Sequence, residues 1–69
     1  MKNRALLLCM KHNIETAEEY ALKIGISLDE ALKILHEETV ISPEVVKRNC
    51  EVFNVSESYF LCITERLEG

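Results

Sequence analysis

A chain of 69 residues has the size of one small domain, near the lower limit for folding without disulfides or metals. Its 48% hydrophobic content supports a core. Its net charge of -4 excludes the overall positive charge that promotes non-specific binding to nucleic acid, but it does not exclude a local basic stripe. The three cysteines lack metal-ligand spacing and leave an odd thiol, so we expect reduced, buried thiols in a cytoplasmic protein. The apolar stretch near the N-terminus is too short for a signal peptide or a membrane span, so we expect no membrane partner.

Sparse glycine and proline favour helices, and the first two are expected over residues 3–11 and 17–24. Helix-forming residues fill the first range, and Asn13 is a plausible stop after it. The sequence "TAEE" places Thr16 at the N-cap of the second helix, with Glu19 as its capping-box partner. Gly25 then supplies the left-handed residue that ends this helix.

Three more helices follow, each introduced by a serine. Ser27 and Glu30 form a second capping box, "SLDE", for a helix that runs to about residue 37. Ser42 caps the next helix, where Pro43 takes the first helical position and its missing N–H costs nothing. Ser56 caps a last helix over residues 57–67. The pattern predicts an all-α domain of five short helices spanning residues 1–69, with no internal boundary.

Residues 16–37 have the layout of a helix-turn-helix motif, two capped helices joined by a short turn that contains glycine. Ala21 is small, as required where the second helix crosses closely, and Gly25 turns the chain with positive φ. Ile26 is expected to plug the turn, and Ala31 and Ile34 to face inward from the second helix.

The stretches "AEEYALKIGIS" and "SPEVVKRNCEVFNVSESYFL" together resemble the lambda-repressor-like (Cro/repressor, Xre-type) helix-turn-helix family, over about residues 14–62. The resemblance implies a five-helix domain, usually a dimer, that binds operator DNA and regulates transcription. Two departures stand out. The expected recognition helix offers leucines and acids where the family exposes polar and basic residues. After that helix the family often has an acidic residue followed by glycine, whereas this chain has Glu37, Glu38 and Thr39.

DNA contacts are expected from the recognition helix and from two cations after it: Ser27, Leu28, Asp29, Leu32, Lys33 and His36, with Lys47 and Arg48 on phosphate. Each has a structural alternative. Ser27 is an N-cap whatever else it does, and Lys33 can pair with Asp29 or Glu37 four residues away. Leu28 and Leu32 fit thymine methyl groups or a protein partner if exposed, and the core if the helix is rotated.

These observations lead to two hypotheses for function. The first is a small DNA-binding transcriptional regulator that acts as a homodimer on double-stranded operator DNA. The second is a non-catalytic protein-interaction module on the same fold, an antirepressor or regulatory partner that uses Leu28 and Leu32 on an acidic face. Core filling is the first interpretation of Tyr59, Phe60 and Ile63, and a dimer seam is the second.

Catalysis is not expected from this sequence. It contains no nucleophile with a matching base, no glycine-rich phosphate loop and no convincing pair of carboxylates. His12 and His36 are not at ligand spacing with any cysteine, so we expect no metal and no cofactor.

Overall fold

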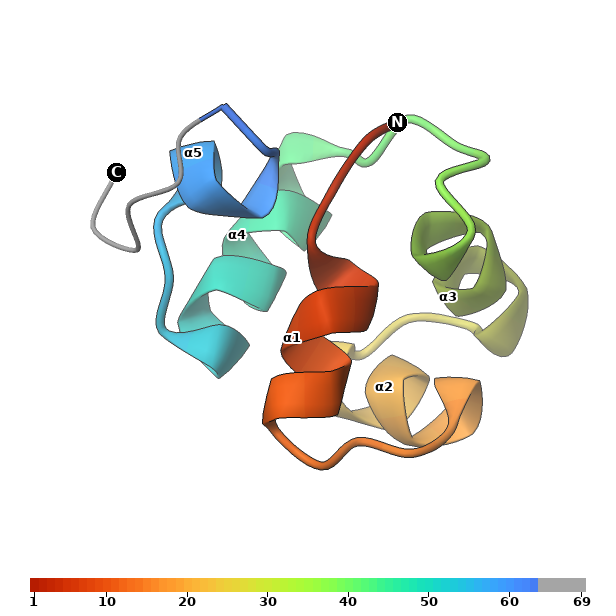
Figure 1. The fold of residues 1–69 in the computed structure, drawn as a ribbon. Helices are drawn as coiled ribbons and strands as arrows, with labels where there is room; N and C mark the ends of the chain where they lie inside the picture. Colours follow the sequence, from red (N-terminus) through yellow and green to blue (C-terminus); the bar gives the residue numbers. More distant parts are fainter. Residues whose placement is uncertain (64–69) are drawn as a thin grey trace.

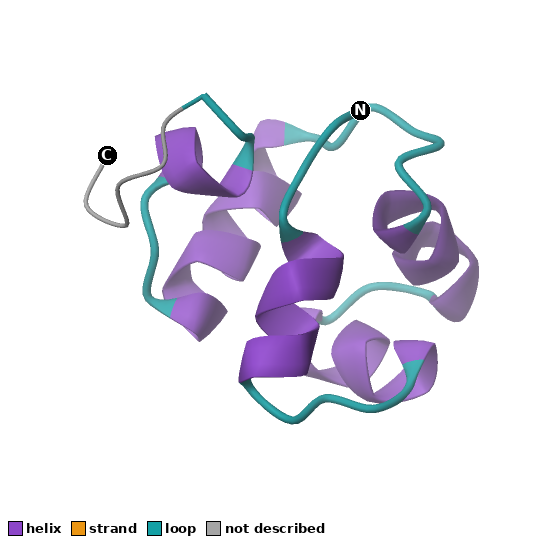
Figure 2. Ribbon diagram, viewed as in Figure 1, coloured by secondary structure: helices purple, strands orange, loops and turns teal. Residues whose placement is uncertain are grey.

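The computed structural model describes residues 1–63, which form five helices and no strand (Figures 1 and 2). The helices are α1 (Ala5–Lys11), α2 (Ala17–Ile24), α3 (Leu28–Leu35), α4 (Pro43–Phe53) and α5 (Glu57–Phe60). In the view of Figure 1, α1 crosses the front of the molecule, α3 lies on one side of it, and α4 and α5 lie on the other. The all-α prediction is therefore confirmed for this part of the chain.

The four predicted Ser and Thr caps are all formed, because each hydroxyl lies within reach of an amide three residues later. The hydroxyl oxygens of Thr16, Ser27, Ser42 and Ser56 accept from the amide N–H groups of Glu19 (3.1 Å), Glu30 (3.2 Å), Val45 (3.4 Å) and Tyr59 (3.1 Å). Each bond satisfies an N–H that has no partner within its own helix. The Glu19 carboxylate reaches back to the N–H of Glu15 (3.3 Å) instead of that of Thr16, so the expected capping box is only half formed.

Left-handed residues end the helices. Gly25 has φ 83° and its N–H donates to the Ala21 carbonyl (2.8 Å), as predicted. Asn13 (φ 59°) follows α1, and Asn54 (φ 56°) caps α4. Asparagine tolerates this conformation better than other non-glycine residues, so both turns were readable from the sequence.

Three predicted boundaries were wrong, and a side-chain acceptor or a residue with positive φ lies near each of them. The first helix begins at Ala5 instead of Asn3, since the Asn3 side-chain oxygen accepts from the Ala5 N–H (2.8 Å). The third ends at Leu35 instead of residue 37, where Glu37 has φ 59°. The fifth ends at Phe60 and Cys62 has φ 63°; the remainder of its predicted range, residues 64–67, lies outside the described residues.

The core lies between α1, α2, α3, α4 and α5, and its largest fully buried side chains are Tyr20, Phe60, Leu8, Ile34 and Asn49. The small residues Ala21 and Ala31 are buried between α2 and α3, whose close approach was predicted from them. Ile26 is half-buried against the core, as expected of the residue that plugs the turn. Cys9 is buried, while Cys50 and Cys62 are half-buried, and all three are free thiols.

A buried polar pair joins α2 to α4. The Tyr20 hydroxyl donates to the side-chain oxygen of Asn49 (2.5 Å), and the Asn49 amide donates to the Val45 carbonyl (2.8 Å). Burial raises the pKa of Tyr20, and Asn49 is the one buried residue in the described part of the chain that is not hydrophobic. The sequence offered no means of pairing these two residues, which are 29 positions apart.

Replacing Tyr20 by phenylalanine is expected to lower the free energy of unfolding by about 1–3 kcal/mol, because Asn49 then keeps a buried acceptor with no donor. Urea unfolding followed by circular dichroism measures the loss. The double variant Tyr20→Phe with Asn49→Leu removes both polar partners and should recover part of it. An unchanged urea midpoint for Tyr20→Phe would contradict the pairing.

Candidate nucleic-acid interface

Helix α3 buries one face and exposes the other. Ala31 and Ile34 are fully buried and Leu35 is half-buried against the core, whereas Leu28 and Leu32 are 43% and 40% exposed. This register confirms that Ala31 and Ile34 face inward. The alternative in which the helix is rotated to bury Leu28 and Leu32 is wrong.

The exposed face of α3 holds two of the predicted contact residues in an ion pair, Asp29 in the first turn and Lys33 in the last. Lys33 Nζ lies 3.2 Å from the Asp29 carboxylate, one helical turn away, and both side chains are mostly exposed. The pairing with Asp29 was one of the two expected. Exposed pairs at this spacing contribute only about 0.3–0.5 kcal/mol, so a phosphate can readily replace Asp29 as the partner of Lys33.

Ser27 is exposed at the N-terminus of α3 and accepts from the Glu30 N–H, so its role as a cap is confirmed and its DNA contact stays a prediction.

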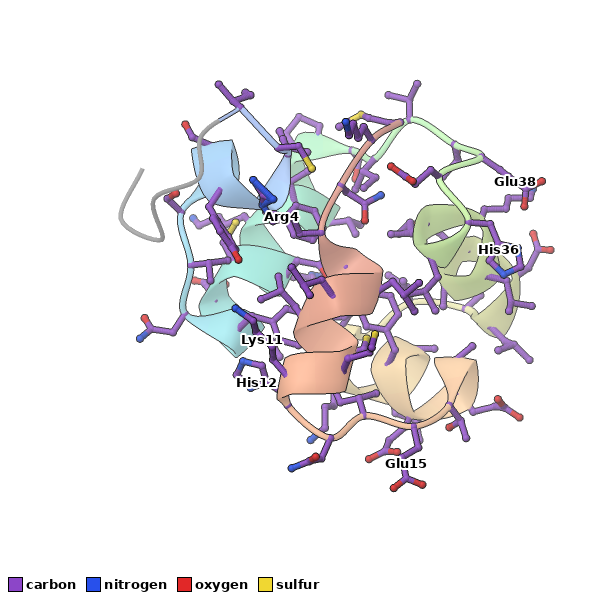
Figure 3. The ribbon with its side chains drawn as sticks, in the orientation of Figure 1. Arg4, Lys11, His12, Glu15, His36 and Glu38 are labelled. Carbon is purple, nitrogen blue, oxygen red and sulfur yellow. The ribbon has the colours of Figure 1, made fainter. Side chains whose placement is uncertain are left out.

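The two acids after α3 have different environments. The Glu37 carboxylate accepts from the backbone N–H of Asn3 (3.1 Å), and the Asn3 amide donates to the Ile34 carbonyl (3.0 Å). These bonds attach the N-terminal segment to the C-terminal end of α3. Glu38 instead lies 3.5 Å from the His36 ring, and Figure 3 shows both side chains at the outer edge of the molecule. Glu37 therefore has a structural role, while His36 and Glu38 remain on the exposed surface.

The two predicted phosphate-binding cations differ. Lys47 is exposed. Arg48 donates through Nη1 to the Gly25 carbonyl (3.2 Å) and through Nη2 to the Glu44 carboxylate (2.7 Å). Arg48 thus fastens α4 to the turn of the motif, a role that the sequence did not predict. As a phosphate ligand it would have to give up or share these contacts.

An open hollow of about 340 Å³ lies beside α3, between its start and the connector to α4. It is lined by Ser27, Asp29, Glu30, Lys33, Thr39, Val40 and Ser42. The hollow thus brings three predicted contact residues next to the N-caps of two helices. Thr39, Val40 and Ser42 were missed as neighbours of α3, because the path of a non-periodic connector is not encoded in local pattern.

The predicted dimer seam does not form one exposed surface. Tyr59 and Phe60 are buried in the core of the single chain, and only Ile63 is exposed, at 75%. The Arg4 guanidinium lies 4.4 Å from the Tyr59 ring centroid, and its Nε donates to the Tyr59 carbonyl (2.8 Å). The interpretation as core filling is therefore correct for Tyr59 and Phe60, and they are not available as a seam.

Within residues 1–63, no group of three or more histidine, cysteine or acidic side chains is arranged to hold a metal ion. No helix of this part of the chain has both the length and the apolar character needed to cross a membrane. Comparisons with protein-family models, with curated proteins and with solved structures found no match to this chain.

Proposed function

We propose that this chain is a small helix-turn-helix DNA-binding transcriptional regulator of the lambda-repressor-like type. The observation that carries the proposal is the geometry of α2, the Gly25 turn and α3. The turn has positive φ, small residues are buried where the two helices meet, and α3 turns a full face to solvent. A helix exposed in this way has a diameter that the major groove, about 12 Å wide, can accept.

The exposed side chains of α3 suggest a division of roles. When a recognition helix binds in the major groove, residues at its start approach base edges, and nearby groups contact phosphates. Ser27 and the first amides of α3 are suited to phosphate, and Leu28 and Leu32 to thymine methyl groups. Asp29 can accept from the amino group of cytosine, while Lys33 and His36 can donate to bases or backbone. Lys47 and Arg48 would add phosphate contacts from α4.

The proposal also covers assembly and location. We place the regulator in the cytoplasm, acting without catalysis as a homodimer on double-stranded operator DNA. Two symmetric copies would read half-sites about 34 Å apart.

Selection from pooled genomic DNA fragments across a salt series tests this function. A sequence-enriched fragment is expected, with affinity that falls as salt rises. Three phosphate contacts, by Lys33, Lys47 and Arg48, give a slope of about -2.7 in log affinity against log salt, or roughly a 40-fold loss over a fourfold rise in salt. No enriched fragment even at low salt would overturn the proposal.

One observation favours a second function, a non-catalytic protein-interaction module. Leu28 and Leu32 are neighbouring exposed leucines, and Lys33, the one cation of α3, is already paired with Asp29. Such a surface also fits a protein partner, as in an antirepressor. Here Leu28→Glu is expected to abolish capture of the partner while leaving the helical content unchanged. A partner that still binds this variant would count against the second function.

A further inference from the structure

Helix α1 carries an apolar stripe that the proposed function does not use. Leu6, Leu7 and Met10 are 57%, 41% and 68% exposed, and their spacing of three and four residues places them on one face. We call these three residues the α1 stripe. Neighbouring exposed apolar side chains on a small domain indicate a site where another molecule binds.

The segment that contains the α1 stripe carries only positive charges of its own. The first acidic residue of the sequence is Glu15, so residues 1–14 contain cations and no acid. Lys2 and Lys11 are exposed on either side of the stripe in the sequence, and Figure 3 shows Lys11 and His12 together at the end of α1. A partner for this stripe should therefore present apolar side chains among acids.

The same chain offers such a surface on α3. Leu28 and Leu32, which we call the α3 patch, lie one turn apart on a helix that carries Asp29 and Glu30, and Glu38 follows it. Lys33 offsets only Asp29, to which it is paired. The α3 patch thus matches the α1 stripe both in apolar character and in charge.

The two surfaces cannot meet within one copy. Helices α1 and α3 are neighbours whose buried faces, Leu8 and Cys9 on one and Ala31 and Ile34 on the other, belong to a single core. The two helices lie side by side (Figure 1), and each turns its exposed face away from that core. A twofold axis beside them would bring the α1 stripe of each copy onto the α3 patch of the other.

We infer that two copies of this chain associate through these faces, with the α1 stripe of each copy against the α3 patch of its partner. Pairing of α1 with α1 would bring the cations of Lys2 and Lys11 together, and pairing of α3 with α3 would bring acids together. Only the crossed pairing opposes unlike charges. This pairing covers α3, so it differs from the DNA-bound homodimer of the proposed function and competes with it. That further consequence rests on the proposed function.

Sedimentation equilibrium of the full chain without DNA tests the inference, with two variants designed as a pair. Met10→Glu puts an acid into the stripe, where it faces the acids of α3, and Leu32→Lys puts a cation into the patch, where it faces the cations of α1. Each variant alone is expected to self-associate at least tenfold more weakly. An equimolar mixture should recover association, since one crossed contact is intact and the other pairs the new carboxylate with the new ammonium.

Leu22→Glu is the matched control. Leu22 is exposed on α2, outside both surfaces, so its variant should associate like the unaltered chain. A chain that stays monomeric at all concentrations would overturn the inference. So would normal association of either variant alone, because a stripe-to-stripe dimer spares Leu32→Lys and a patch-to-patch dimer spares Met10→Glu.

The selection of DNA fragments tests the proposed function independently of this interface. Association through these surfaces without any enriched DNA fragment would leave the interface standing and remove the proposed function. If DNA is bound, Met10→Glu should bind it more tightly than Leu22→Glu. Both substitutions add one negative charge outside α3, but only Met10→Glu weakens the competing association.

Discussion

Replacing Phe60 by alanine is expected to lower the free energy of unfolding by about 3–5 kcal/mol, the usual cost of removing a buried aromatic ring. Phe60 is fully buried, and α5 contributes only Glu57–Phe60 to the fold, so little else can close the cavity. A core of this size rarely supplies more than about 3–5 kcal/mol. The variant should therefore be largely unfolded at room temperature, which the loss of far-ultraviolet circular dichroism would reveal.

Ile63→Ala serves as the control for this experiment. Ile63 is an apolar residue from the same predicted seam, but it is exposed, so its removal should change the unfolding free energy by less than about 0.5 kcal/mol. The contrast separates a core role from a dimer role. A folded Phe60→Ala variant that differs only in its oligomeric state would show that Phe60 belongs to an interface.

The sequence predicted those features that depend on a few neighbouring residues. The caps at Thr16, Ser27, Ser42 and Ser56 are local hydrogen bonds between a hydroxyl and an amide three residues away, and all four form. The turn at Gly25 likewise follows from the one residue that adopts positive φ without strain.

Features that depend on distant partners escaped prediction. Glu37 takes the left-handed conformation where glycine is usual, and its carboxylate meets Asn3, 34 residues away. Arg48 caps the Gly25 carbonyl across 23 residues. Nothing in the local sequence distinguishes these two residues from ordinary surface charges.

The candidate site shows the same limit. Helical periodicity left two placements open for Leu28 and Leu32, outside the core or, in a rotated helix, within it, and the structure shows the first. It could not decide whether Tyr59 and Phe60 are covered by their own chain or by a second copy, because an apolar pattern says only that a side chain is covered. The fold resolves this by packing both residues into the core beside Arg4.

The second large effect is expected at Lys33. If α3 reads DNA, Lys33→Glu should raise the dissociation constant for the enriched fragment by about 5- to 150-fold, corresponding to 1–3 kcal/mol. The substitution removes a cation from the exposed face of α3 and adds a charge that phosphate repels. It also leaves Asp29 opposite a like charge, but an exposed pair is worth under about 1 kcal/mol, so the fold should persist. Fluorescence anisotropy at one salt concentration measures the binding.

Lys11→Glu is the matched control, because it changes the net charge by the same two units from a different helix. Lys11 lies on the side of α1 that faces away from α3 (Figure 3). With the protein dilute enough to prevent association through the α1 stripe, only its general field should change, and the effect on affinity should be a few-fold at most. Lys33→Arg should keep most of the affinity, since it keeps the charge. Equal losses of DNA affinity for Lys33→Glu and Lys11→Glu would mean that the affinity depends on the overall charge of the domain and that α3 is not the DNA-binding surface.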